Sequence, residues 1–506
     1  MKAVVHSRIM AKEQEVASGE RLAAEGGIAS DESAVAEPEI EANEGLAEEH
    51  ENEPDASTAA EGDSGEAGCP VRMGWRDDAS RCGRRLHVAP DRVDERPVCL
   101  MHSKDPNKQS GPLFGAFWRE FEKILEDADV GEANFERFVF PKLDLSKRKF
   151  NSVCRFGEAI FTQDANFFAV TFAQRTGFGG ATFMHEANFL GTTFTHDAYF
   201  TNAIFTQTAF FWRTQFHGIA SWVNCRFLDQ AVFRRTTFDP TDEEKPSAVF
   251  ETAKFSKPGE VVFDDVDLSQ ALFHDCDVSE VWFTSSVRWG KREGNRGLAV
   301  FEETIPLDQR HMDRLKSDGQ RDYRAVAQIY QQLKKNYDSR LDYWTANEFH
   351  FGEMEMKRLA GPTTGPLLWL RRWWQRNLSF VALYRWASDY GNSYRKPALW
   401  LLFFILFLFP ALFPLHGVGL KRQGATQAET YTSTWNLQKG YGENLGMEAR
   451  LFGKSAITSV DTATFQRNAE YAPAYPWGRV LAIVETLLTS SLFALFLLAI
   501  RRQFRR

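Results

Sequence analysis

The sequence lacks most of the features that mark an enzyme or a secreted protein. No long apolar run lies within Met1–Ser30, so we expect no secretory signal there. We find no nucleophile beside a base, no glycine loop of the kind that binds phosphate, and no carboxylate pair at a catalytic spacing. These absences predict a protein that is not an enzyme.

Basic residues are absent from Asp31–Glu66, which carries 14 acidic residues, although the whole chain has a formal charge of −8. The rest of the chain is therefore net positive. A segment this acidic has too little apolar surface to offset the entropy lost on ordering. We expect residues 1–66 to be a disordered acidic tail that acts either as a solvated spacer or as an interaction site.

Phenylalanine, in contrast, is abundant, with 43 residues among 506. Aromatic residues recur at alternating gaps of five and six, and alanine often stands two positions before them. A strand returns to one face every two residues and a helix every 3.6, so the rhythm favours a stack of short repeated segments. The central residues are Phe156, Phe161, Phe167, Phe172, Phe178, Phe183, Phe189, Phe194, Phe200, Phe205, Phe211 and Phe216, followed in register by Trp222, Phe227, Phe233 and Phe238.

This pattern, in units such as ANFLGTTFTHD and ANFFAVTFAQR, resembles the pentapeptide-repeat family in its eleven-residue double-unit variant. The resemblance covers about 156–283 and implies a right-handed, four-sided β-helix over 150–290, with about four regular coils and one or two looser ones. Cys154, Cys225 and Cys276 stand where the repeat usually has alanine, so we expect them to be small buried residues. The near-neutral surface of 151–238 gives no support to the DNA mimicry of some family members.

Four other metal-ligand residues precede the repeat, namely Cys69, Cys82, Cys99 and His102, with His87 in reserve. Three thiolates and one imidazole form a closed tetrahedral zinc site, which is structural because no position is left open for catalysis. We expect a structural zinc in residues 67–108, and the alternative is unliganded thiols in a disordered segment. Residues 109–149 should link or cap the repeat.

The segment after the repeat is expected to be helical. Apolar residues at three-and-four spacing within 318–362 predict two antiparallel helices with a break near Asp338, similar to the helical piece that joins repeats to the membrane in related bacterial proteins. Lys334, Glu353 and Glu355 should form either a solvated face or a binding surface. Residues 363–397 mix tryptophan and arginine, which suits the lipid headgroup layer better than nucleic acid.

Two apolar runs, 398–416 and 480–500, are each long enough to cross a bilayer as a helix. Basic residues at their outer ends predict that both termini are cytoplasmic. Pro410 and Pro414 should kink or end the first span near Phe409. The loop 417–479 should be extracytoplasmic. Its GYGEN stretch is a poor match to a potassium filter, and residues near Phe452 form either a re-entrant or interfacial helix or a short loop helix.

Glu485 lies inside the second apolar run, where a charge is costly. We consider it a candidate proton or ion site or an oligomer contact, and the alternative is that it pairs or snorkels near the interface. The sequence as a whole predicts a bacterial inner-membrane protein whose cytoplasmic solenoid is a scaffold for protein partners, with membrane but no nucleic acid as a further partner. The alternative is a pore or transporter component built from hairpins in a homo-oligomer.

Overall fold

The computed structural model describes residues 68–73, 80–87, 89, 93–239, 245–292, 297–304, 322–362, 366–415, 418–423, 430–433, 441–466 and 470–504. The expected acidic tail, 1–66, lies outside these residues. The described residues up to 87, together with 95–99, form one compact unit, and the other described residues form a second.

The first unit contains two short antiparallel ribbons. In one, β1 (Arg72–Met73) pairs with β2 (Ser80–Arg81), and in the other, β3 (Leu86–His87) pairs with β4 (Val98–Cys99). Ribbons this short cannot bury a core of their own, so another interaction must contribute to their stability.

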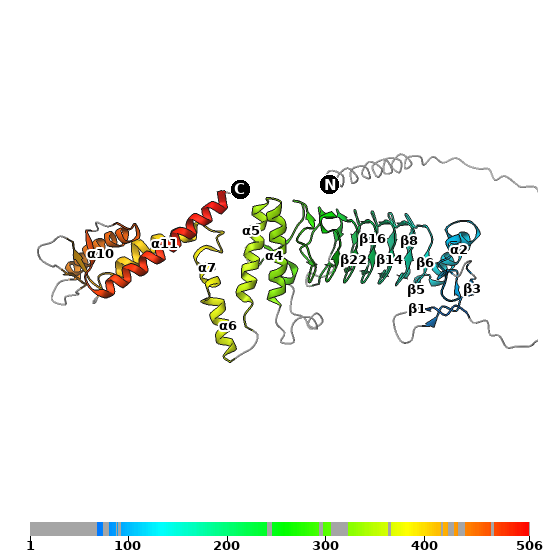
Figure 1. Cartoon of the computed structure of the whole chain (residues 1–506), viewed down its shortest axis with the longest axis horizontal. Helices are drawn as coiled ribbons and strands as arrows, with labels where there is room; N and C mark the ends of the chain where they lie inside the picture. The colour runs from blue at the N-terminus through cyan, green and yellow to red at the C-terminus, as the bar shows by residue number, and fades with distance from the viewer. Residues whose placement is uncertain are drawn as a thin grey trace, which may run out of the picture. The chain divides into compact units, whose positions relative to one another are not determined.

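The second unit contains a parallel β-solenoid of about seven turns, which confirms the repeat solenoid predicted from the phenylalanine rhythm. Its strands, most of them two residues long, form four parallel sheets and stack as successive rungs (Figure 1). The first sheet contains β6 (Val139–Phe140), β10 (Ile160–Phe161), β14 (Thr182–Phe183), β18 (Ile204–Phe205), β22 (Arg226–Phe227) and β26 (Lys254–Phe255). The second contains β7 (Leu143–Asp144), β11 (Ala165–Asn166), β15 (Ala187–Asn188), β19 (Ala209–Phe210), β23 (Ala231–Arg234), β27 (Val261–Asp264) and β29 (Trp282–Phe283).

The other two sheets complete each turn. The third contains β8 (Lys149–Phe150), β12 (Thr171–Phe172), β16 (Thr193–Phe194), β20 (Gln215–Phe216) and β24 (Thr237–Phe238). The fourth contains β5 (Glu132–Asn134), β9 (Val153–Arg155), β13 (Thr176–Gly177), β17 (Ala198–Tyr199), β21 (Ala220–Ser221), β25 (Ala248–Val249) and β28 (Ala271–Leu272). The solenoid therefore begins at Glu132, within the segment that was expected to link or cap the repeat.

The register of the strands explains the phenylalanine rhythm. Phe161 pairs with Phe183, and Phe183 with Phe205, so equivalent residues of successive turns lie directly above one another. Their rings stack in the interior, as Phe167 and Phe189 do with centroids 4.8 Å apart and an interplanar angle of 1°. A ring column of this kind buries apolar surface that no single turn could bury alone.

A second regularity is a left-handed backbone residue at every eleventh position. Glu158, Ala169, Gly180, Gly191 and Asn202 all have φ between 53° and 70°, and the series continues in later turns. Only two of these five residues are glycine, although glycine adopts this conformation at the lowest cost. The corner geometry therefore recurs even where the side chain does not favour it.

Both ends of the solenoid are covered by helices. At the first end, Phe121 of α2 (Gly111–Ala128) stacks on Phe135 with ring centroids 4.6 Å apart. At the other end, Trp289 donates from Nε1 to the Tyr337 hydroxyl at 3.0 Å, and the Tyr337 ring stacks on Phe283. Capping of this kind hides the apolar end rungs, which would otherwise bind another copy.

The second cap is the pair α4 (Tyr323–Ser339) and α5 (Tyr343–Leu359), which pack against each other. Asn336 of α4 donates from Nδ2 to the carbonyls of Val278 and Val281, each at 2.7 Å. The turn between the helices occupies residues 340–342, close to the break expected near Asp338. Smaller elements nearby are η2 (Pro106–Gln109), η3 (Pro258–Glu260), β30 (Gly290–Lys291), β31 (Leu298–Ala299) and α3 (Phe301–Thr304).

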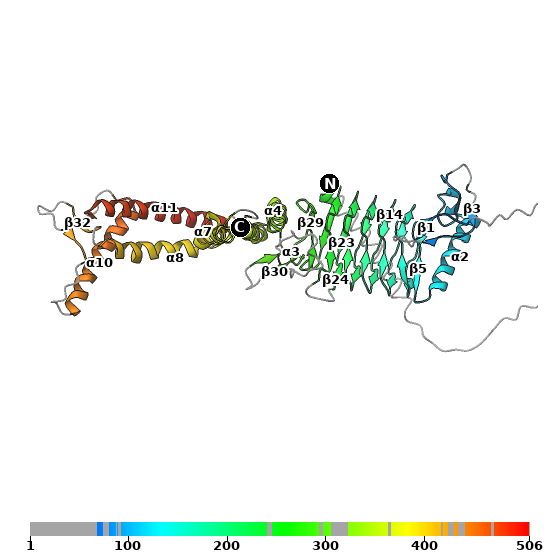
Figure 2. The same ribbon diagram turned by 90° about the horizontal axis from the view of Figure 1, so that it is seen from below.

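Two short helices, α6 (Leu368–Asn377) and α7 (Phe380–Ser388), lead to two helices that are long and apolar enough to cross a membrane. The first spans Arg395–Leu412 and is continuous through α8 (Arg395–Phe403), the π-helical segment η5 (Phe404–Leu408) and α9 (Phe409–Leu412). The second is α11 (Pro476–Phe504). They run side by side (Figure 2) around a core that includes Phe404, Phe409 and Leu492.

The first apolar helix ends at Leu412, three residues after Phe409 and two before Pro414, close to where Pro410 and Pro414 were expected to end it. Its π-helical segment lies just before Pro410, where proline leaves an i−4 carbonyl without its usual donor. Between the two long helices, α10 (Tyr441–Ala463) packs on α9 and α11, and a small sheet contains β32 (Leu420–Arg422), β33 (Thr430–Tyr431) and β34 (Tyr471–Pro473).

Candidate functional sites

The first candidate site is a group of four metal-ligand side chains. The ligand atoms of Cys69, Cys82, Cys99 and His102 all lie within 4.8 Å of one another. Cys69, Cys99 and His102 are buried, and Cys82 is half-buried. His87, the reserve ligand, is not part of this group. The four residues chosen from the sequence could thus hold a metal ion together.

Local backbone pairing explains how the cysteines meet. The Cys82 N–H donates to Val71 O at 2.7 Å and the Cys69 N–H donates to Arg84 O at 2.8 Å, so the first two cysteines face each other across the ribbon base. Cys99 closes the second ribbon, where it lies opposite Leu86.

The sulfur spacing suits a metal rather than a disulfide. The Sγ atoms of Cys82 and Cys99 are 3.8 Å apart, and none of the six cysteines, all of which the structure describes, forms a disulfide. A disulfide would need a separation of about 2.05 Å. Two thiolates at corners of a zinc tetrahedron with Zn–S bonds of about 2.3 Å lie about 3.8 Å apart. Arg84 donates from Nη1 to Cys82 Sγ at 3.3 Å, a contact that stabilises a thiolate.

The histidine is held by groups outside the cluster. Its Nε2 lies 3.2 Å from Glu136 O, and its ring meets Phe138 edge-on with centroids 5.1 Å apart. When Nε2 donates to that carbonyl, Nδ1 carries the lone pair that a metal requires. This outer contact is the usual way in which a protein fixes the ring of a metal-binding histidine.

The remaining cysteines are part of the solenoid interior. Cys154, Cys225 and Cys276 have between 0% and 1% exposure. Burial raises the pKa of Cys154 to about 12, and it also raises the pKa of Cys225 and Cys276. Thiols with pKa values this high are neutral and unreactive at physiological pH.

The residues predicted to form the repeat core all lie inside the solenoid. Exposure is 0% for the first eleven of them and 1% for the last, and they are Phe156, Phe161, Phe167, Phe172, Phe178, Phe183, Phe189, Phe194, Phe200, Phe205, Phe211 and Phe216. They are therefore structural residues, and any binding by the solenoid must use the side chains that point outward.

Glu485 is the one candidate residue inside an apolar helix. Its side chain has no exposed surface, and the Ser459 hydroxyl of α10 donates to its Oε1. Its Oε2 has no hydrogen-bond partner among the described residues. Snorkelling and an oligomer contact would both need an exposed carboxylate, so this geometry favours neither. Other hydroxyl-bearing residues are buried in α10 and α11, namely Ser455, Thr458 and Ser459 of α10 and Thr489 of α11.

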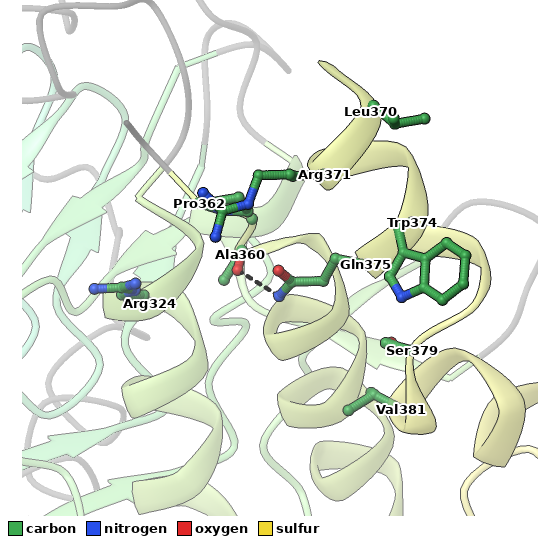
Figure 3. A pocket seen from close by; sticks show the side chains of 10 residues that line it. Arg324, Ala360, Pro362, Leu370, Arg371, Trp374, Gln375, Ser379 and Val381 are labelled. Atoms are coloured by element: carbon green, nitrogen blue, oxygen red, sulfur yellow. Dashed lines mark hydrogen bonds between the residues drawn. The ribbon is translucent and has the colours of Figure 1, made fainter. Parts of the chain in front are cut away.

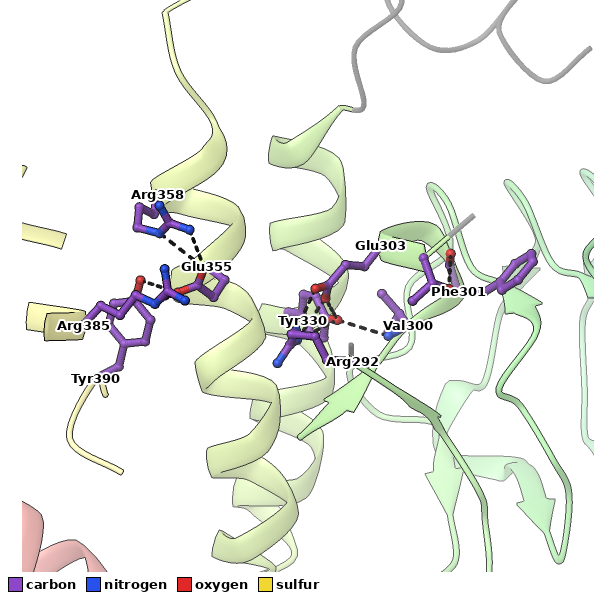
Figure 4. Close-up of polar contacts among 10 residues, drawn as sticks. Arg292, Val300, Phe301, Glu303, Tyr330, Glu355, Arg358, Arg385 and Tyr390 are labelled. Carbon is purple, nitrogen blue, oxygen red and sulfur yellow. Dashed lines mark hydrogen bonds and ion pairs between the residues drawn. The ribbon is translucent and has the colours of Figure 1, made fainter. Parts of the chain in front are cut away.

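Sequence reasoning missed the polar network that ties α5 to the helices after it. Glu355, expected on a solvated face or a binding surface, is only 6% exposed. It accepts from Arg358 Nη2 at 2.8 Å, from Arg385 Nε at 2.9 Å and from the Tyr390 hydroxyl at 2.9 Å (Figure 4). Arg502 at the end of α11 donates to Tyr390 O at 2.9 Å, so the network reaches the second apolar helix.

A second network joins α4 to the last turns of the solenoid. Glu303 accepts from Arg292 Nε at 2.6 Å and from the Tyr330 hydroxyl, which also accepts from the Val300 N–H at 3.1 Å (Figure 4). Glu353 of α5 is 5% exposed, and His350 and Lys357 lower its pKa to about 2. Glu353 and Glu355 of this helix pair are therefore paired and buried, which no periodicity could reveal.

The tryptophan and arginine segment has exposed side chains and an open groove. The groove, of about 650 Å³, lies where α6 and α7 meet the end of α5 and the start of α4. Its lining includes Arg324, Arg371, Trp374 and Gln375, and Gln375 donates to Ala360 O at 2.8 Å (Figure 3).

Comparison with family models, with curated proteins and with solved structures gives no match for this chain.

Proposed function

We propose that this chain is a membrane-anchored scaffold without catalytic activity, in which the β-solenoid is the platform that binds protein partners. We further propose that the solenoid is a right-handed, four-sided β-helix of the pentapeptide-repeat type. The spacing of 22 residues between paired strands, and the distribution of the strands over four sheets, support a four-sided turn of two eleven-residue units.

The observation that carries the scaffold proposal is the continuous packing from solenoid to apolar helices. The solenoid interior is filled by stacked rings, its last turns are bonded to α4, and α5 is joined through Glu355 to α7. A stiff solenoid that is capped at both ends and joined through helices to two membrane-length helices can hold one surface in a fixed position. Outward side chains on such a surface can select a partner without any catalytic group.

The proposed location is the bacterial inner membrane, with Arg395–Leu412 and α11 as two spans and both termini in the cytoplasm. Arg395 and Lys396 begin the first of these helices, and Arg501 and Arg502 lie near the end of the second. Basic residues are retained on the cytoplasmic side of a membrane, which supports this orientation. The resemblance of the repeat to bacterial membrane proteins supports the compartment.

We also propose that the metal bound by the cysteine and histidine group is zinc. Three thiolates and an imidazole in a closed, buried arrangement are typical of structural zinc, and the sulfur spacing fits its bond lengths. Such an ion would stabilise ribbons that are too short to fold alone.

The second candidate function is a pore or transporter component. It is favoured by Glu485, a buried carboxyl in an apolar helix with one oxygen that has no partner among the described residues. Ion flux into liposomes that contain the full chain separates the two functions. The scaffold proposal predicts no flux from either wild type or Glu485→Gln, whereas flux that the substitution alters would replace it with the pore.

A further inference from the structure

Helices α6 and α7 expose an unusual amount of apolar surface. The exposed fraction is 70% for Trp369, 59% for Trp374 and 92% for Phe380, and no residue of α6 is buried. Burial of large aromatic side chains is favourable, so leaving several in water is costly. A patch of this kind normally faces a partner or a membrane.

The same surface carries positive charge. Helix α6 contains Arg371, Arg372 and Arg376 and no acidic residue. Arg371 forms no ion pair with any residue that the structure describes, and Arg376 Nε is buried without a hydrogen-bond partner among those residues. By contrast, Arg385 of α7 is paired with Glu355. Arg371, which is exposed, is therefore available for an anion.

The groove beside α6 combines both properties. Arg324 and Arg371 line it from two different helices, and Leu370, Trp374 and Val381 supply apolar walls (Figure 3). A ligand that fits has an anionic group next to long apolar chains. An anionic phospholipid has this chemistry, whereas nucleic acid or free phosphate would leave the apolar walls exposed.

Helix α7, which supplies Val381 to the groove, also packs on the first apolar helix. The ring of Trp386 in α7 lies against Trp400 of α8 with centroids 3.8 Å apart, and six residues separate α7 from Arg395. We propose that α6 and α7 lie in the headgroup layer and that the groove binds an anionic phospholipid. In this arrangement Arg371 and Arg324 hold the phosphate, and Leu370 and Trp374 contact the acyl chains. The inference rests on the proposed membrane anchoring.

The test is native mass spectrometry of the full chain, released from mixed micelles that contain equal amounts of phosphatidylglycerol and phosphatidylcholine. We expect wild type to retain the anionic lipid at least about fivefold more than the zwitterionic one, since two charge contacts are each worth about 1 kcal/mol near a membrane. The double variant Arg324→Gln, Arg371→Gln should lose the preference, and Arg324→Lys, Arg371→Lys should keep most of it because the charges remain.

Three controls make the result decisive. Arg119→Gln, an exposed arginine on α2, should leave lipid retention unchanged. An excess of inorganic phosphate should not displace the lipid. Equal retention of both lipids by wild type, or an unchanged preference in the double glutamine variant, would overturn the proposal. Failure of the membrane anchoring itself would be seen separately, as release of wild type from membranes at alkaline pH.

Discussion

The most informative perturbation is Phe189→Ala in the middle of the solenoid. The Phe189 ring has no exposed surface and stacks between Phe167 and Phe211, at centroid distances of 4.8 and 5.1 Å. Removal of a buried phenylalanine costs about 3–5 kcal/mol, because apolar contacts are lost and a cavity remains. Because the ring is stacked on both sides, we expect the loss of stability to lie towards the upper end of this range.

Amide hydrogen exchange is the suitable assay, because unfolding of a repeat array need not be all-or-none. The Phe189 N–H donates to Phe210 O at 2.8 Å, and its neighbours make equivalent bonds to the next turn. A loss of about 4–5 kcal/mol in local opening free energy speeds exchange by about 1,000- to 5,000-fold. The effect should be largest at amides of the turns directly above and below.

The matched control is Thr195→Ala, at an exposed position directly after β16. It should change the opening free energy by less than about 0.5 kcal/mol. If Phe189→Ala changed exchange as little as this control does, the ring columns would not be what holds the turns together.

Three further predictions concern other parts of the chain. Elemental analysis of the full chain should find about one zinc, which Cys99→Ala removes and Cys154→Ala leaves in place, since only the first residue belongs to the metal group; zinc retained by Cys99→Ala would contradict the site. Burial raises the pKa of Glu302 to about 7, so the folded chain holds this proton more tightly than the unfolded chain, whose carboxyl ionises near 4.5. Stability near the Phe273 amide, which donates to Glu302, should therefore fall by about 3 kcal/mol as pH rises from 4.5 to 7, and Glu302→Gln should abolish that slope in exchange protection factors. Gly352→Ala would place a Cβ 2.6 Å from the Tyr330 ring, so it should weaken α4–α5 packing by about 1–3 kcal/mol. The control Gly446→Ala, whose Cβ would meet nothing within 4 Å, should be neutral or slightly stabilising. Equal amide exchange rates in both variants would exclude the close contact at Gly352.

The solenoid could be predicted from sequence because its repeat is local and frequent. Most strands contribute a phenylalanine or an alanine at a fixed position, and hydrogen bonds to the next turn bring those positions into register. The extent of the solenoid was harder to see. Its first strand, β5, begins at Glu132. The rhythm is less regular in this first turn, where Leu143 of β7 occupies the position that alanine usually has.

Single interactions between distant segments could not be predicted in this way. Glu355 is paired with Arg385, 30 positions along the chain, and Glu485 contacts Ser459 of another helix. No periodicity links such residues, since their meeting depends on how whole helices pack. The metal group was an exception, because three cysteines and one histidine within a short segment already indicated a common site.

The account as a whole is tested most directly by photo-cross-linking in cells that make the full chain. A photoreactive residue is placed at Thr195, exposed on the solenoid, or at Phe380, exposed on α7. A membrane-anchored scaffold predicts a discrete protein adduct from position 195 and lipid adducts from position 380. Lipid adducts at position 195, or none at position 380, would contradict it.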